Sequence, residues 1–251
     1  MRHSLYPVKI FHSLCRTPLK VFSVFVFFLM LSIAGSSMAQ NPPKPAVDLQ
    51  PLKANYQVKI ETGGQTFPLS VTAEIKEENG AWVATEIART PQGEVSDRAI
   101  LEKGTLILTK RTVKQGPVEI NVAFKDKKAT GSMTMNGQTR AIDAETLGAM
   151  FADGAGTYFV VAALPLAEGY TTSFYNFDLS SSKTSLKQLK VVGAEKVTVP
   201  AGIFDAFKVE ITTAGSESGK TTVWIAKDTR KQVKTVAQSS QGATITSELQ
   251  P

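Results

Sequence analysis

The stretch VTVPAGIFDAFKVEITT, residues 197–213, decides the fold class of this 251-residue chain. It predicts a strand, a tight Pro-Ala-Gly turn at 200–202 and a second strand whose alternate residues are apolar, because successive side chains of a strand point to opposite faces. Nearly all of 56–249 repeats this pattern of strand, tight turn and strand. Short connections make neighbouring strands antiparallel. We therefore expect a mainly β protein, with a curved antiparallel sheet or half-barrel of about a dozen strands.

The same periodicity continues on both sides of this stretch. Apolar and polar residues alternate over 67–76 and 118–125, which indicates strands with one buried and one solvated face. Asn79-Gly80 and Asn136-Gly137 are typical of two-residue hairpin turns. Gly193, in the middle of a long strand pattern, predicts a bulge or kink.

Residues 144–164 interrupt the alternation. The sequence AETLGAMF suits a short helical turn, and TYFVVAALPL is a continuous apolar run that stops at Pro165. We expect one short helical segment near 144–164, too short to span a membrane, that serves as a lid or plug on one side of the sheet.

The first 39 residues have the pattern of a secretory signal peptide. A basic leader without acidic residues precedes the apolar run VFSVFVFFLMLSIAG at 21–35, and Ser37 and Ala39 suit a cleavage site before Gln40. No Cys follows the run, so lipoprotein processing is not indicated. We expect a signal peptide over 1–39, a Pro-rich, extended linker over 40–55 and one β-rich domain over 56–251, with strands in 56–143 and a further part over 144–250. The expected location is the periplasm or the exterior, without a membrane span after cleavage; a leader retained as an anchor is the alternative.

Removal of the leader changes the composition that bears on function. Four of the 28 basic residues but none of the 22 acidic residues lie in the leader, so the net charge falls from +6 to +2. A chain this close to neutral is not expected to bind nucleic acid. The only Cys and both His residues also lie in the leader. The remainder therefore cannot form a Ser-His-Asp or Cys-His arrangement or the common zinc, copper and haem ligand sets, and we expect no enzyme, no catalytic residue, no metal and no cofactor.

Two weaker patterns point to other chemistry. AGSESGKT at 214–221 fits a loose phosphate-binding loop, but a β-branched run follows it where that motif needs a helix, so a hairpin loop explains it. Paired carboxylates could meet only in the fold, so a carboxylate-based hydrolase stays open as an alternative.

Three segments resemble one family of bacterial exported proteins. They are ALPLAEGYTTSFYNFD at 163–178, VTVPAGIFDAFKVEI at 197–211 and W-x-A-K-D-T-R-K-x-V at 224–233, followed by a final Ser-Glu-Leu. In this order they resemble the domain of unknown function 3108 (DUF3108) over 155–250, and 56–143 matches more loosely. The resemblance implies a fold but no activity. At the level of the fold, the sheet of this family is also similar to the half-barrel of periplasmic lipoprotein carriers of the LolA/LolB kind.

These observations lead to one hypothesis and two alternatives. The hypothesis is an exported, non-enzymatic β-protein that binds an apolar, lipid-like ligand or an envelope partner on its concave sheet face. The first alternative is an envelope assembly module that adds a partner's strand to a sheet edge, and the second is the carboxylate hydrolase. The ligand, the partner and the oligomeric state stay open. The residues expected to line the ligand site are Phe151, Tyr158, Phe159, Leu164, Phe174 and Trp224.

Overall fold

The structure is a computed structural model that describes residues 41–90, 93–216, 219–239 and 242–251. These residues belong to one compact unit, Met38–Pro251. The predicted signal peptide over 1–39 and its cleavage site lie outside the described residues.

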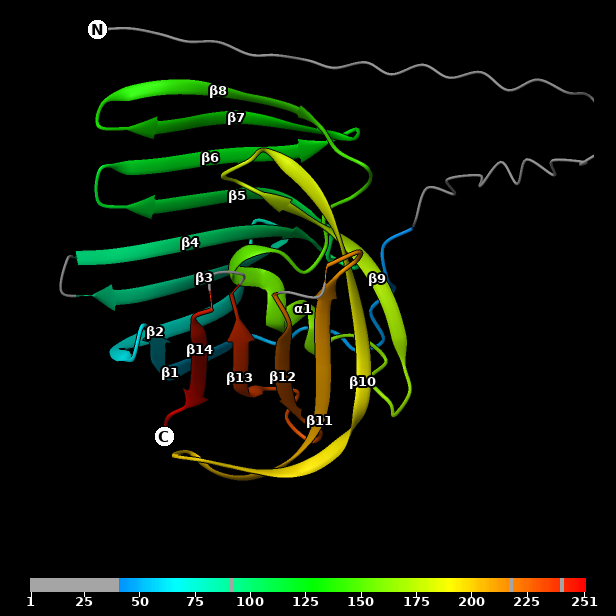
Figure 1. The fold of residues 1–251 in the computed structure, drawn as a ribbon. Helices are drawn as coiled ribbons and strands as arrows, with labels where there is room; N and C mark the ends of the chain where they lie inside the picture. The colour runs from blue at the N-terminus through cyan, green and yellow to red at the C-terminus, as the bar shows by residue number, and fades with distance from the viewer. Residues whose placement is uncertain (1–40, 91–92, 217–218, 240–241) are drawn as a thin grey trace, which may run out of the picture. The chain divides into compact units, whose positions relative to one another are not determined.

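The described residues form one sheet of fourteen antiparallel strands (Figure 1). The sheet curves but does not close, which confirms the expected fold class. The strands are β1 Leu52–Thr62, β2 Gln65–Glu78, β3 Ala81–Thr90, β4 Gly93–Glu102, β5 Leu108–Gln115, β6 Val118–Lys125, β7 Lys128–Met135, β8 Gln138–Glu145, β9 Thr171–Asp178, β10 Lys183–Val199, β11 Gly202–Thr213, β12 Thr221–Ala226, β13 Gln232–Gln238 and β14 Thr244–Leu249.

The order of the strands shows how the chain builds this sheet. From β1 to β8 each strand pairs with the next, so the chain moves outward to one edge of the sheet. The chain then crosses to the opposite edge at β9 and returns strand by strand to β14, which pairs antiparallel with β1 from Tyr56↔Leu249 to Glu61↔Thr244. The first and last strands are therefore neighbours in the middle of the sheet.

Among the described residues, helical structure occurs in the crossing segment, which leads from β8 to β9. A 3₁₀ turn, η1 Gly154–Gly156, continues into α1 Thr157–Ala162. A helical segment was expected near 144–164; β8 extends into that range as far as Glu145, so the helical part begins later. The crossing chain donates from Phe151 N to the Tyr175 carbonyl of β9 (3.0 Å), and its Met150 carbonyl accepts from Leu108 N of β5 (2.9 Å). The crossing segment therefore hydrogen-bonds to part of the β9 edge.

The core consists of two clusters of buried apolar side chains. The larger joins side chains of β2–β8 and β9–β12 to the crossing segment, and the smaller joins side chains of β1 and β2 to others of β10–β14. Phe159 of α1 packs against both clusters. Phe159 therefore connects the two parts of the core, and α1 lies against β13.

Two local predictions, a tight turn and a bulge, are confirmed. Gly202 has φ +134°, a value that residues with a side chain rarely adopt, at the Pro-Ala-Gly turn between β10 and β11. At Gly193 the register of β10 against β11 shifts between Val191 and Gly193, as expected of a bulge.

Candidate functional site

The segment Pro45–Pro51, which we call the strap, packs more closely on the domain than a Pro-rich linker was expected to. The backbone N–H groups of Ala46 and Val47 both donate to the Ala163 carbonyl at the end of α1, at 2.8 and 3.2 Å. The Leu49 side chain is buried and belongs to the larger core cluster. The strap leads directly into β1, which begins at Leu52 rather than at Tyr56.

A pocket of about 500 Å³ lies between the strap, α1 and the turn that joins β12 to β13. We call it the helix pocket. Its walls combine apolar side chains of the strap and helix with the polar residues of the turn. The lining residues are Val47, Asp48, Leu49, Gln50, Pro51, Leu52, Phe159, Ala162, Ala163, Asp228, Thr229, Arg230 and Lys231. Its volume falls in the range of ligand sites, which is about 300–1,000 Å³.

A second pocket, of about 400 Å³, lies between the strap, β3 and the turn that joins β4 to β5. We call it the tryptophan pocket, because Trp82 and Leu106 supply its apolar wall. At its rim the Lys103 ammonium and the Glu77 carboxylate form an ion pair of 2.8 Å, so this end carries a neutralised charge. Residues Val47–Pro51 line both pockets.

The turn between β12 and β13 is cationic on the side of the helix pocket. Arg230 donates through Nη1 to the carbonyls of Ala162 and Leu164, at 3.4 and 3.3 Å, and so binds the C-terminal end of α1. Positive charge is favourable at that end of a helix. Arg230 and Lys227 also lie over the Phe207 ring, each 5.4 Å from its centre. Within the described residues neither of these cations, nor Lys231, has a carboxylate at ion-pair distance.

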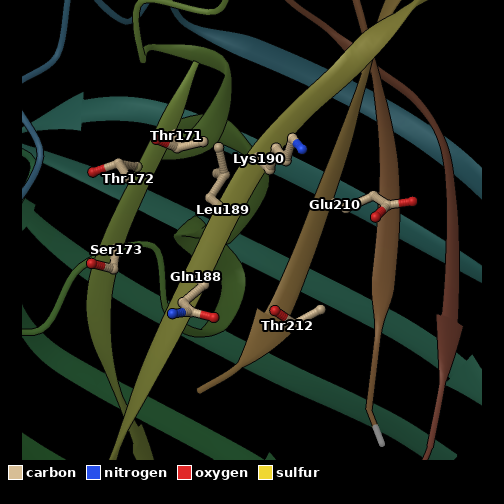
Figure 2. A pocket seen from close by; sticks show the side chains of 8 residues that line it. All are labelled: Thr171, Thr172, Ser173, Gln188, Leu189, Lys190, Glu210 and Thr212. Carbon is tan, nitrogen blue, oxygen red and sulfur yellow. The ribbon is translucent and has the colours of Figure 1, made fainter. Parts of the chain in front are cut away.

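A third hollow, of about 460 Å³, crosses β9, β10 and β11 (Figure 2). Hydroxyl, amide and charged side chains dominate its lining, and the Glu210 carboxylate is paired with Lys220. Leu189 is its one aliphatic member and is buried in the core. This hollow therefore offers little apolar surface. Its lining residues are Thr171, Thr172, Ser173, Gln188, Leu189, Lys190, Glu210 and Thr212.

An ionic cluster lies under η1 on the inner face of the sheet. The Arg111 guanidinium binds Asp97 through Nε and Nη2, the shortest distance being 2.7 Å, and reaches Asp153 Oδ1 through Nη1 at 3.2 Å. Asp153 also accepts from the backbone N–H groups of Gly154 and Phe177, both at 2.8 Å. Arg111 thus connects β4 and β5 to the start of the helical segment. Burial raises the pKa of the Asp153 carboxyl, although Arg111 and the two N–H groups oppose the shift.

Glu86 is the acid of this region without a cationic hydrogen-bond partner among the described residues. It pairs in register with Asp97 on the neighbouring strand, so two carboxyl groups lie side by side. Burial, with a smaller effect from the Asp97 charge, raises the pKa of Glu86 to about 8. Its charge also contributes to raised pKa values of Tyr56 and Tyr158, whose main cause is burial. These groups form a polar region inside the fold, in which the Tyr158 hydroxyl is hydrogen-bonded to Thr235.

The structure disperses the six residues that were expected to line a ligand site. Phe159 lines the helix pocket, whereas Tyr158 is directed to Thr235 and the polar region. Phe151, Leu164 and Phe174 are buried in the larger core cluster, and the rings of Phe151 and Phe174 are 5.9 Å apart. Trp224 borders the smaller cluster and donates from its indole N–H to Glu195 at 2.7 Å, with Lys208 over its ring.

Sequence reasoning did not find the other components of the two pockets. The strap was read as a spacer, although Val47 and Leu49 are apolar residues between its prolines. Arg230 and Lys231 belong to the turn between β12 and β13, and a turn sequence does not reveal which helix end it meets. Trp82 is buried beside the strap.

The fold and its pockets define a class: a curved antiparallel β-sheet protein whose crossing helix and N-terminal strap enclose apolar pockets. The chain belongs to the family described as Protein of unknown function (DUF3108), whose model matches residues 53–250. This confirms the resemblance seen in the sequence and extends it over the first strands.

Comparison with solved structures finds several matching chains, among them two of low identity. One is the hypothetical lipoprotein YmcC from Escherichia coli (K12), with 10% identity, a TM-score of 0.33 and coverage of 79% of this chain and 83% of that one. The other is a DUF1329 family protein from Desulfovibrio piger ATCC 29098, with 10% identity, a TM-score of 0.31 and coverage of 80% and 84%. A search of curated proteins gave no match. In the described part of the chain, no helix has the length and apolar character needed to cross a membrane.

Proposed function

We propose that this is an exported, non-enzymatic protein that binds an apolar, lipid-like ligand, and that the helix pocket is the binding site. The observation that carries the proposal is the pocket itself. Phe159, Ala162 and Ala163 present one side of α1 to a space of about 500 Å³, and the strap supplies the facing apolar wall. Ligand sites in proteins have this character, with mostly apolar walls and a few polar groups.

The leader supports the exported location, and the composition supports the absence of an enzyme. The sequence from Asn41 onward contains neither Cys nor His, which removes the commonest nucleophile and base arrangements. Two acids, Glu86 and Asp97, lie side by side in the fold, and Arg111 binds the Asp97 carboxylate. A protein with apolar pockets and few reactive side chains is better suited to carry or sense a ligand than to transform it.

The test compares two adjacent residues of α1. Phe159→Asp places a carboxylate in the wall of the helix pocket, so it should weaken binding of a fluorescent fatty-acid probe by about tenfold or more, which corresponds to about 1.4 kcal/mol or more. Tyr158→Asp instead puts a charge beside Glu86 and removes the bond to Thr235, so it should mainly lower the stability of the fold. Probe titrations and urea unfolding curves of both variants separate the two effects.

The outcomes are distinguishable. If both variants bind the probe like the wild-type protein, the helix pocket is not the binding site. Recovery of no lipid from protein purified from its native envelope, together with no binding of fatty-acid probes, would contradict the carrier function as a whole.

The sheet edge at β8 favours a second candidate, an envelope module that adds a partner's strand. In the described residues β8 pairs with β7 alone, and most of its side chains are exposed. Such an edge is a template for strand addition. A stoichiometric partner captured from envelope extract by the wild-type protein, and lost when Ala141 in β8 is replaced by Pro, would favour this function over ligand carriage.

A further inference from the structure

The strap takes part in two pockets of the fold. Its residues Val47–Pro51 line both the helix pocket and the tryptophan pocket. We propose that the two pockets are halves of one groove beneath the strap, and that this groove holds a single-chain amphiphile with an anionic head group. The inference rests on the proposed function, to which it adds the ligand class and the direction in which the ligand lies.

The strap is attached in a way that permits it to move. Its side chains are exposed except for Pro45, which is partly buried, and Leu49, which is buried. Among the described residues, the backbone hydrogen bonds of the strap to the body of the domain are the two that end on the Ala163 carbonyl. Segments with few buried contacts and few hydrogen bonds open at low free-energy cost.

Leu49 shows what the middle of the groove accepts. It lines both pockets, and it packs in the core cluster that also contains Trp82 and Leu106. An alkyl chain has the same apolar surface and can replace it when the strap lifts. The walls that such a chain would contact are Phe159, Ala162 and Ala163 in one half and Trp82 and Leu106 in the other.

The charges at the two ends of the groove set the direction in which the ligand lies. At the tryptophan end, Lys103 is already paired with Glu77. At the helix end, Arg230, Lys231 and Asp228 of the turn line the pocket, and Lys227 lies outside the lining, over the same Phe207 ring as Arg230. Asp228 accepts from the Thr229 backbone N–H. Apart from Asp48, which lines both pockets, the helix end has two cations against one acid and the tryptophan end has one of each, so the helix end is the better place for a carboxylate or phosphate head group.

The first experiment fixes the strap. Val47 and Ala163 are joined by a backbone hydrogen bond, and the sequence from Asn41 onward has no Cys, so Val47→Cys with Ala163→Cys provides one thiol pair. A fluorescent palmitate analogue and its octanoate counterpart are titrated into the oxidised and reduced protein. Oxidation should weaken palmitate binding by at least about tenfold, because the open state is no longer populated, and leave octanoate binding within about twofold. Reduction should restore palmitate binding.

A second variant keeps the test decisive if the disulfide does not form. Leu49→Ser removes the buried anchor of the strap, so the palmitate analogue should associate faster, by about threefold or more. Stopped-flow mixing measures the rate. An unchanged rate in Leu49→Ser, or equal palmitate binding by the oxidised and reduced cysteine pair, would overturn the strap as a gate.

The third experiment tests the head group. Lys227→Glu and Lys231→Glu should each weaken binding of the palmitate analogue and of a palmitoyl lysophosphatidate by about threefold or more and reduce its salt dependence, whereas binding of a neutral monoglyceride should not change. Lys128→Glu, an exposed lysine of β7 outside both pockets, is the control.

The results distinguish this inference from the function on which it rests. If octanoate and palmitate bind the wild-type protein, but neither oxidation of the cysteine pair nor the lysine substitutions change palmitate binding, the single groove is wrong. The helix pocket then remains the proposed binding site. If no probe binds the wild-type protein, the proposed function fails as well. Loss of neutral and anionic ligands alike in the lysine variants would contradict the anionic head group alone.

Discussion

Arg111 is the residue on which the position of the helical segment depends most directly. Its guanidinium is bonded to Asp97 on β4 and to Asp153 at the start of η1. Because both acids are largely buried, removal of the cation leaves two carboxyl groups without their charge partner. Buried carboxylates of this kind are costly unless paired.

We predict that Arg111→Leu lowers the free energy of unfolding by about 3–5 kcal/mol. Arg89→Leu, which changes an exposed arginine of β3, should alter it by less than about 0.5 kcal/mol. Urea titrations of both variants measure the difference. Equal stability losses would mean that the cluster contributes nothing specific to the fold.

Glu86 gives the fold a dependence on pH with a defined sign. Its pKa rises from an ordinary value of 4.5 to about 8 in the folded protein, so the folded state holds a proton that the unfolded state has lost between these values. Stability therefore falls as pH increases from about 4.5 to about 8 and changes little from this source outside that window.

Glu86→Gln should remove this part of the pH dependence. The variant should be more stable than the wild-type protein above pH 8 by on the order of 1–3 kcal/mol, and the difference should disappear toward pH 4.5. Chemical unfolding at a series of pH values checks it. Asp153 also has a raised pKa but is present in both proteins, so it does not affect the comparison. Parallel pH profiles for the two proteins would contradict the role of Glu86.

At the scale of the strand, Gly131 in β7 is required by a close approach of two backbones. A Cβ atom at this position would lie 1.9 Å from the carbonyl oxygen of Asn121 on β6, and backbone atoms cannot move aside as a flexible side chain can. We predict that Gly131→Ala destabilises the protein by about 2–4 kcal/mol through displacement of β7.

Ser132→Ala is the matched control, because Ser132 is the next residue of β7 and pairs with Asn121. It should change stability by less than about 1 kcal/mol. Thermal unfolding followed by circular dichroism measures both variants. A Gly131→Ala variant as stable as this control would show that β6 and β7 are not as close as described.

Local patterns sufficed to predict the elements but not how they combine. Alternation and glycine-containing turns identified the strands, and Gly193 and Gly202 were read correctly because a bulge and a tight turn are decided by neighbouring residues. The pairing of β1 with β14 joins residues nearly two hundred positions apart, and no short-range pattern encodes it. The crossing helix was found by its apolar run, but its start depends on Asp153, which binds the backbone N–H groups of Gly154 and Phe177.

The candidate site was the less predictable part for a related reason. Aromatic residues were chosen because they suit apolar ligands, yet Phe151 and Phe174 pack against each other in the core. Phe159 lies in the pocket wall because α1 turns it away from Tyr158, which could not be known before the orientation of the helix. The strap and Arg230 join the site through contacts with the end of α1 that are remote in sequence.

For the whole molecule, the composition leads to a prediction about what holds the fold together. The sequence from Asn41 onward has no Cys or His, so neither a disulfide nor an imidazole-bound metal can contribute. Protein starting at residue 41 should unfold at the same temperature, within about 1 °C, with and without a reductant or a strong chelator. Differential scanning calorimetry measures this. A decrease of several degrees with the chelator would reveal a cation bound through carboxylates.

The pairing of β1 with β14 also has a consequence for the time at which the protein becomes complete. A chain that is synthesised from its N-terminus delivers β1 before β14, so the edge of β1 that pairs with β14 stays open until β14 has been made. Contacts this remote along the chain slow the search for the native state, and exposed strand edges during that interval favour aggregation. The period of greatest vulnerability therefore falls between the emergence of β8 and the arrival of the six-residue strand β14, when a holding chaperone would have most to protect.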